Sequence, residues 1–422
     1  MTVTHVKRAP RPLNETDPVV RRRVTDLLAR LEAGREGEAE RLATEFDGWS
    51  GPIEVSAAQI EAASRSLSPQ LIDDIAHAHD HIRRFADAQL ASITEFEIEV
   101  EPGLRAGQRN VPLAVAGCYV PAGRFAHVAS ALMSVTTAAS AGVESVVVAS
   151  PARPERGGVH PAILHAAHVA GADRIVGLGG VQAIGALALG LFTGLEADVI
   201  VGPGNSFVAE AKRQLFGRVG IDVIAGPTES MIVADDTADP DMVATDLIGQ
   251  AEHGPDSPVW LVTTSPDLAH SVDARCRNYA ERLPDPSRAS AVAAWRDHGE
   301  IVLVDTRDEA ALVCDDYAPE HLQVLAADLA WWRARLRNYG SLFLGPHTNV
   351  AFGDKSAGPN HILPTGRTAR YTGGLNALTF VKQLTWQELT PEAGAREAGV
   401  AARISRLEGM EGHARSADLR RR

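Results

Sequence analysis

The sequence predicts an α/β protein with two layered domains, each built on a parallel-rich sheet of incomplete Rossmann-like type. Two observations predict this class. Short runs rich in valine and isoleucine lack polar alternation, which is typical of strands buried on both faces. Nearly every such run is followed by a segment with helical periodicity, and this alternation fills two successive parts of the 422 residues. We also expect an N-terminal helical region and a C-terminal helical tail.

The N-terminal region, residues 1–110, is expected to be helical and to pack on the second domain. Apolar residues recur at helical spacing over 17–46 and again over 60–90. Neither segment shows a pattern of side chains that completes a chemical site. The region is therefore interpreted as structural.

The first α/β domain is expected over 111–235. Its predicted strands and following helices are 113–120 with 126–141, 145–149 with 161–170, 174–177 with 183–191, and 198–201 with 206–216.

The second α/β domain is expected over 236–380, with the metal and catalytic residues. Its predicted strands are 259–263, 301–304, 322–325 and 341–344, and its predicted helices are 241–250, 268–282, 309–315 and 329–338. The tail, 381–422, carries a predicted helix over 391–407.

Composition excludes several classes of protein. A net charge of −13 disfavours nucleic acid as a partner, and no apolar run reaches the roughly 20 residues of a membrane span. No apolar segment follows the basic residues near the N-terminus, so a cytoplasmic location is expected. Cys118, Cys276 and Cys314 are scattered and odd in number, which argues against a disulfide framework.

The segment around residue 250 offers a chelating pair. Gln250 and His253 are three apart on a last helical turn, so both heads point the same way, and Gly254 and Pro255 end the helix. An amide oxygen and an imidazole suit a divalent cation, although zinc needs further donors from elsewhere. From this segment alone, a histidine that caps helix carbonyls is the simpler interpretation.

Two glycine-rich turns follow predicted strands. Gly177-Leu178-Gly179-Gly180-Val181-Gln182 opens a helix but has Gln182 in place of the third glycine of a dinucleotide fingerprint. Gly202-Pro203-Gly204-Asn205 repeats the arrangement one unit later. Each turn alone is equally explained by its backbone dihedrals, but the pair at one sheet edge favours a nucleotide cleft.

Further chemistry lies in the second half. Glu320 and His321 place an acid beside an imidazole at a helix-to-strand junction, a combination suited to general acid and base catalysis. Residues 353–361 supply Asp354 and His361 in what is expected to be an irregular loop, because it is rich in glycine and proline. Near the C-terminus, His413 has no obvious structural role.

These stretches together resemble the histidinol dehydrogenase family over nearly the whole chain. The matching motifs, in order, are GCYVP (117–121), GGVQAI (179–184), GPGN (202–205), QAEHGPDS (250–257), APEHL (318–322), GD (353–354), NH (360–361), and Glu408 with His413. The resemblance implies a homodimer of two α/β domains with a shared active site. It also implies oxidation of an alcohol to a carboxylate in two NAD-dependent steps, with zinc in each site.

The resemblance assigns roles to particular residues. The positions matching the zinc ligands are Gln250, His253, Asp354 and His413, the last arriving on the tail of the partner subunit. His321 matches the base for the hydroxyl proton, and Glu320 the residue that activates water against the aldehyde. Tyr119, Gln182 and Asn205 match cofactor contacts, whereas Thr228, His361 and Glu408 match substrate contacts, with Thr228 where serine is usual. Cys118 is interpreted as a packing residue rather than a nucleophile.

Two departures bear on the substrate. Lys355 follows the ligand Asp354 where an aromatic residue is usual, and the block 369–375 differs from the expected serine-rich run. Both departures resemble the branch that includes sulfopropanediol 3-dehydrogenase, which oxidises (R)-2,3-dihydroxypropane-1-sulfonate to sulfolactate. A lysine near the metal suits such an anionic substrate, so Lys355 is predicted to contact it. L-Histidinol, oxidised to L-histidine, is the alternative substrate, and a catalytically degenerate nucleotide-binding homologue is the alternative of another class.

Overall fold

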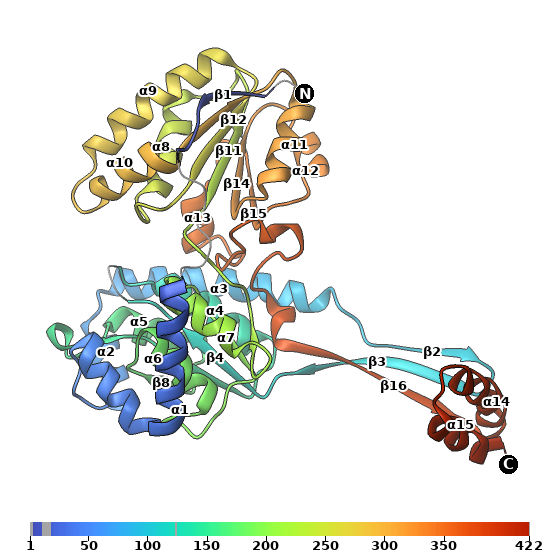
Figure 1. Cartoon of the computed structure of the whole chain (residues 1–422). Coiled ribbons are helices and arrows are strands. Elements are labelled where there is room, and N and C mark those ends of the chain that lie inside the picture. Colours follow the sequence, from blue (N-terminus) through green and yellow to red (C-terminus); the bar gives the residue numbers. More distant parts are fainter. Residues whose placement is uncertain (1–2, 11–17, 123–124, 422) are drawn as a thin grey trace.

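The computed structural model describes residues 3–10, 18–122 and 125–421, and it confirms the α/β class. Two layered domains lie one above the other in Figure 1, and a long arm extends from the lower, first domain. None of the helices in the described ranges is long and apolar enough to cross a membrane.

The first domain has a five-stranded parallel sheet of order β10-β9-β4-β5-β8. Its strands are β4 (Val115–Tyr119), β5 (Ser145–Ala149), β8 (Arg174–Val176), β9 (Val199–Val201) and β10 (Gly220–Ile221). Helices α4 (Val128–Ser140) and α5 (Pro161–Ala170) share one core, and α6 (Gly180–Leu189) and α7 (Ser206–Leu215) share the other. A short hairpin, β6 (Ala152–Arg153), η1 (Pro154–Arg156) and β7 (Gly158–Val159), joins β5 to α5.

The N-terminal helices pack on the first domain, so the expectation that this region packs on the second domain is wrong for them. They are α1 (Pro18–Asp47), α2 (Ala57–Ser66) and α3 (Pro69–Ala91). Leu27 and Leu31 of α1 lie in the core of α6, and Ile75 and Ile82 of α3 lie in the core of α4 and α5. The predicted helix over 60–90 is two helices, because Ser68 caps a new helix at Pro69.

The second domain has a six-stranded sheet of order β1-β13-β12-β11-β14-β15, parallel except for β1. Its strands are β1 (Thr4–Lys7), β11 (Ser230–Ala234), β12 (Val259–Thr263), β13 (Glu300–Leu303), β14 (His321–Leu325) and β15 (Ser341–Leu344). Helices α8 (Pro240–Ala251), α9 (Pro266–Arg282) and α10 (Ser287–His298) pack in one core. Helices α11 (Arg307–Tyr317) and α12 (Leu329–Arg335) pack in the other, and α13 (Val350–Lys355) follows β15.

The boundary predicted at residue 235 is wrong, because β11 is a central strand of the second sheet. Its buried run Met231 to Val233 pairs with β12 and β14, and not with any strand of the first sheet. Only β1, from the N-terminal region, joins the second domain as expected.

The arm is an antiparallel sheet of β2 (Phe96–Glu101), β3 (Leu104–Pro112) and β16 (Val381–Leu389), followed by α14 (Pro391–Leu407) and α15 (Glu411–Asp418). The tail therefore begins with a strand and is not wholly helical, whereas its helix over 391–407 is confirmed. In Figure 1 the arm carries α14 and α15 away from both domains. The remaining short turns are η2 (Thr368–Arg370), η3 (Ala377–Phe380) and η4 (Leu419–Arg421).

Candidate active site

The predicted base, His321, is the first residue of β14 and is buried. Its Nδ1 lies 3.1 Å from the backbone carbonyl oxygen of Glu229, so Nδ1 carries the proton and donates it. Its Nε2 lies 3.3 Å from Oδ1 of Asp354. Burial alone would lower the pKa of His321, but the Glu320 and Asp354 carboxylates raise it to about 9.

Glu320 is buried beside a second acid that the sequence analysis did not identify. Its Oε2 accepts a hydrogen bond of 2.9 Å from the backbone N–H of Glu229 and lies 3.6 Å from Nδ1 of His321. Burial raises the pKa of Glu320 to about 8 and that of Glu229 to about 7. A carboxyl group that changes protonation near neutral pH suits transfer of a proton. Glu229 directly precedes β11 and had no sequence signal beyond being an acid next to a buried strand.

Of the two predicted metal ligands at the end of α8, Gln250 lies on its last turn, whereas His253 lies in the turn just beyond the helix and not on the helix as expected. Gln250 is buried, and within the described part of the chain its Oε1 has no hydrogen-bond partner. His253 is exposed in the single chain, but partial loss of surrounding water lowers its pKa, and it interacts electrostatically with Asp354 and His321. An unpaired buried amide oxygen and a neutral imidazole are the states in which these groups bind a cation, so the donor set fits zinc.

Asp354 is not in an irregular loop, as the sequence suggested, but on the last turn of α13. Asn349 caps this helix by accepting a hydrogen bond of 3.1 Å from the backbone N–H of Phe352. The cap stabilises the helix enough to offset the unfavourable helix propensity of Gly353. Although burial opposes ionisation, His321 holds the pKa of Asp354 well below its usual range. Asp354 is therefore a carboxylate, the form that ligates metals.

Glu408 and His413 lie at the far end of the arm, away from these ligands in the same chain (Figure 1). Both are exposed. Over the ranges that the structure describes, no three His, Cys, Asp or Glu side chains of one chain are grouped to hold a metal ion. The predicted four-ligand set can thus be completed only if His413 comes from another copy.

Asp246 links the three elements that carry the predicted metal and catalytic residues. It lies on α8 one turn before Gln250, and its Oδ2 accepts from Nε2 of Gln323 on β14 at 2.8 Å. Its Oδ1 lies 3.5 Å from Nδ2 of Asn349, the cap of α13. A carboxylate shared by α8, β14 and α13 fixes the distances between these elements. It therefore also fixes the distances between the predicted metal and catalytic side chains that they carry.

We expect Asp246→Leu to weaken zinc binding by about ten- to a hundredfold, because Gln323 and Asn349 lose their common acceptor. Competition with a chromogenic chelator measures this directly. Asp241→Leu, which removes an exposed acid from the first turn of the same helix, is the matched control. Equal zinc affinity in parent and Asp246→Leu would contradict the positioning role.

Two residues beside α4 join the site without having been predicted. His127 precedes α4 and interacts electrostatically with Lys355, His253 and Asp354, and its burial lowers its pKa to about 4. Ser130 on α4 lies 2.9 Å from Nε2 of His361. No motif marked either residue, because their proximity to the second domain is a tertiary contact.

The predicted substrate contacts lie around this point. His361 donates from Nδ1 to the carbonyl oxygen of Asp354 at 3.0 Å, so its Nε2 accepts from Ser130. Burial lowers the pKa of His361 to about 4 and keeps it neutral. Lys355 is exposed and interacts electrostatically with His127, His253 and His361, and Thr228 immediately precedes Glu229.

The predicted cofactor residues lie at the carboxyl edge of the first sheet. The buried Tyr119 ends β4, and its hydroxyl oxygen accepts from the backbone N–H of Gly180 at 3.2 Å. Gln182 is buried in the first turn of α6, and Asn205 caps α7 by accepting from Phe207 and Val208.

A buried ion pair braces the second glycine turn. Lys212 pairs with Asp222 and also donates to the carbonyl oxygen of Gly202 at 3.0 Å, while Asp222 accepts from the N–H of Gly202 at 2.7 Å. A Cβ at Gly202 would lie 2.0 Å from the carbonyl oxygen of Tyr119, so only glycine fits here. The turn is therefore rigid and close to β4.

Cys118 is fully buried, and this burial raises the pKa of its thiol to about 12. A protonated, enclosed thiol is a poor nucleophile, which agrees with its interpretation as a packing residue.

Comparison with known proteins places this geometry in a family. The family model described as histidinol dehydrogenase matches residues 10–421. The chain belongs to the histidinol dehydrogenase family. It is therefore an enzyme, a dehydrogenase of the alcohol-oxidising type, and the predicted family membership is confirmed.

Individual relatives carry two kinds of name. The chain is 56% identical over 424 residues to a histidinol dehydrogenase homolog of Ruegeria pomeroyi, covering 100% of this chain and 97% of that one. It is 51% identical over 420 residues to a sulfopropanediol 3-dehydrogenase of the same organism, covering 100% and 96%. A solved histidinol dehydrogenase from Elizabethkingia anophelis superposes with a TM-score of 0.90 at 30% identity, covering 97% of this chain and 94% of that one.

Proposed function

We propose that the protein oxidises a short anionic primary alcohol to a carboxylate with NAD, in two successive hydride transfers through an aldehyde. The observation that carries this proposal is the buried pair Glu320 and His321, held against Asp354 on the amino edge of the second sheet. Two adjacent groups with different proton affinities suit two successive proton transfers.

We propose zinc as the resident metal, held by Gln250, His253 and Asp354 of one chain and His413 of the partner subunit's arm. When bound there, zinc would polarise the substrate hydroxyl and fix its position. A cation at Asp354 would also oppose the charged form of His321, lowering its pKa toward the neutral form that a base requires.

The two catalytic side chains then act in turn. His321 takes the hydroxyl proton from the substrate as hydride leaves for NAD. Glu320, as a carboxylate, takes a proton from the water that attacks the aldehyde, giving a hydrate whose second oxidation yields the acid. The burial of both residues keeps bulk water from competing with these transfers.

A homodimer is proposed because the arm leaves apolar surface uncovered. Phe96, Ile98 and Val100 alternate along one face of β2 and are more than half exposed, and Leu407 near the tip is 88% exposed. Such a patch on an extended arm is suited to packing on a second copy. The same packing would bring His413 and Glu408 to the other chain's site. A cytoplasmic location fits this assignment.

The proposed substrate is (R)-2,3-dihydroxypropane-1-sulfonate. Support comes from the 51% identical relative named sulfopropanediol 3-dehydrogenase and from Lys355, a cation beside the site where the sulfonate could bind. L-Histidinol is the second candidate, supported by the family model and by the structural match. A panel of both alcohols and a neutral diol, followed by NADH formation, separates them. Two NADH per alcohol supports the full reaction, whereas none with any alcohol would indicate a degenerate nucleotide-binding homologue.

Lys355→Met should lower kcat/KM for the sulfonate by about ten- to a hundredfold, because a charge-assisted hydrogen bond is lost. Its zinc content and its rate with the neutral diol should stay near those of the parent. Lys382→Met, on strand β16 of the arm, is the matched control. An equal loss with charged and neutral alcohols would contradict a role in binding the anion.

A further inference from the structure

The carboxyl edge of the first sheet holds an acid that the proposed reaction does not use. Asp47 is the last residue of α1, and its side chain is 9% exposed. Its Oδ2 accepts from Nε2 of Gln182 at 3.1 Å, and its Oδ1 lies 3.6 Å from the guanidinium of Arg153. Three elements far apart in sequence thus meet where the cofactor is proposed to bind.

The strand order of the first sheet allows the position of Asp47 to be compared with that of the ribose-binding acid in other dinucleotide-binding folds. When the five strands are numbered by their order along the chain, they lie in the sheet in the order 3-2-1-4-5, from β8 to β10. This is the Rossmann order. In that fold an acid near the end of the second strand binds the adenosine ribose of NAD, and an arginine nearby accommodates the 2′-phosphate of NADP. The second strand here is β5, and it is followed by Ser150, Pro151, Ala152 and Arg153 without an acid. Asp47 of α1 instead places a carboxylate beside Arg153.

In the two glycine-rich turns, the backbone N–H groups of Gly180 and Gly202, which could otherwise bind a phosphate, already have hydrogen-bond partners. The N–H of Gly180 is bound by the Tyr119 hydroxyl, and that of Gly202 by the carboxylate of Asp222. The side chain of Asn205 is used to cap α7. Binding of the cofactor at this edge must therefore depend more on side-chain acceptors such as Asp47.

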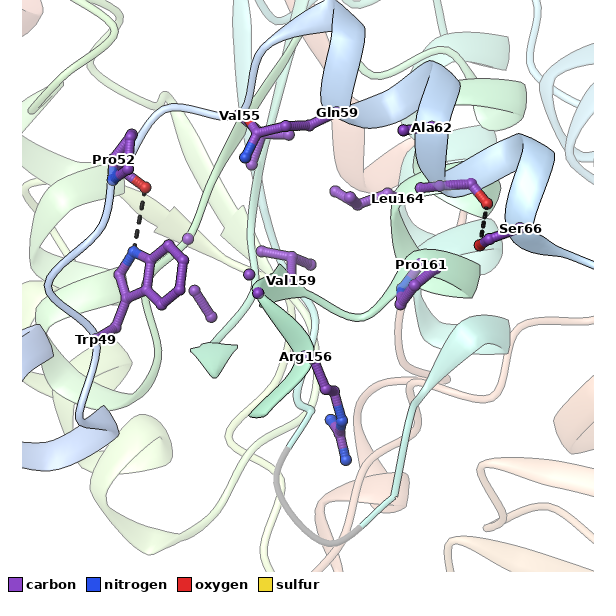
Figure 2. A pocket seen from close by; sticks show the side chains of 15 residues that line it. Trp49, Pro52, Val55, Gln59, Ala62, Ser66, Arg156, Val159, Pro161 and Leu164 are labelled. Carbon is purple, nitrogen blue, oxygen red and sulfur yellow. Dashed lines mark hydrogen bonds between the residues drawn. The ribbon is translucent and has the colours of Figure 1, made fainter. Parts of the chain in front are cut away.

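A cavity of about 250 Å³ is lined by chain neighbours of Asp47 and Arg153 (Figure 2). Trp49, two residues beyond Asp47, forms one wall, and Val55 and Leu164 form others. Ala152, next to Arg153, and Gly177, which begins the first glycine turn, also line it. A mostly apolar cavity with an aromatic wall, lined by residues that neighbour Asp47 and Arg153 in the chain, suits a purine base.

We propose that Asp47 binds the adenosine ribose of NAD, that the cavity walled by Trp49 receives the adenine, and that Asp47 excludes NADP. The carboxylate accepts from the ribose hydroxyls and repels a 2′-phosphate. It also holds Arg153, the side chain that would otherwise bind that phosphate. This inference rests on the proposed NAD-dependent function.

The test compares NAD with NADP in parent and Asp47→Asn protein. Asp47→Asn should lower kcat/KM for NAD by about ten- to a hundredfold and raise that for NADP, because a charged acceptor is lost and Arg153 is released. Adding Arg153→Met should abolish the gain with NADP. Asp173→Asn, which removes an acid at the opposite edge of the same sheet beside β5, is the matched control and should leave the NAD to NADP ratio unchanged.

A second variant tests the cavity without touching Asp47. Ala62 is exposed at the cavity wall, so Ala62→Phe can fill the cavity without disturbing a core. We expect its KM for NAD and its Kd for AMP, measured by calorimetry, to rise at least about tenfold, with kcat unchanged at saturation.

The outcomes separate this inference from the proposed function. If the parent uses NAD but Asp47→Asn keeps its NAD to NADP ratio, or Ala62→Phe keeps its affinity for AMP, the inference is overturned and the function stands. If the parent oxidises no alcohol but binds AMP, and both Asp47→Asn and Ala62→Phe weaken that binding, the proposed function is wrong and the adenosine site is supported.

Discussion

Replacing Glu320 with glutamine is expected to leave the first hydride transfer largely intact and to slow aldehyde oxidation by about 100- to 10,000-fold. The amide oxygen can still accept from the N–H of Glu229, so the local structure should persist. The amide cannot take a proton from water, however, whereas His321 can still take one from the alcohol. Single-turnover measurements that start from the alcohol and from the aldehyde separate the two steps.

Glu229→Gln is the matched control, because it neutralises the adjacent buried acid while leaving Glu320 as the base. It should change both steps by similar, smaller factors. If Glu320→Gln slows the two steps equally, the assignment of Glu320 to the water step is wrong.

Mixing two inactive variants, His413→Ala and His321→Ala, is expected to restore about a quarter of the parental activity after random exchange of subunits. Half of the dimers would then be mixed. Each mixed dimer would hold one intact site, built from His321 of one chain and His413 of the other, and one doubly defective site. The exposed position of His413 at the arm's tip motivates this expectation.

Native mass spectrometry establishes that exchange has occurred, and metal analysis should show one tightly bound zinc per mixed dimer. A matched control pairs His321→Ala with Glu320→Ala, two changes in the same body of the chain, which should give no recovery. Absence of recovery in the test mixture, despite demonstrated exchange, would refute a ligand supplied in trans.

The sequence determined the local elements and the chemistry that they carry. The α8 prediction is correct because apolar spacing, an Asp-Pro start and a Gly-Pro stop all act within about a dozen residues. The helix-to-strand junction at Glu320 and His321 was likewise predictable from local signals, since a short, mostly apolar segment that is fully buried follows it. Strand β2 also had an unused local signal, because Phe96, Ile98 and Val100 alternate with glutamates.

Only the tertiary structure decided which of these elements meet. Asp354 lies on a helix because Asn349 caps it, and that cap is itself held by Asp246 from α8. The packing of α1 to α3 on the first domain, and the place of β11 in the second sheet, depend on which apolar faces fit together. Hydrophobic periodicity shows that a face is buried but not against what.

The pairing of Asp47 with Gln182 shows the same limit, since 135 positions separate the two residues. A hydrogen bond across that distance leaves no periodic trace in either segment. Local propensity and spacing thus determined the helices, the strands and the reactive side chains. Their convergence was decided by burial and polar pairing between distant segments, because those free energies depend on the three-dimensional neighbours of a residue and not on its neighbours in the chain.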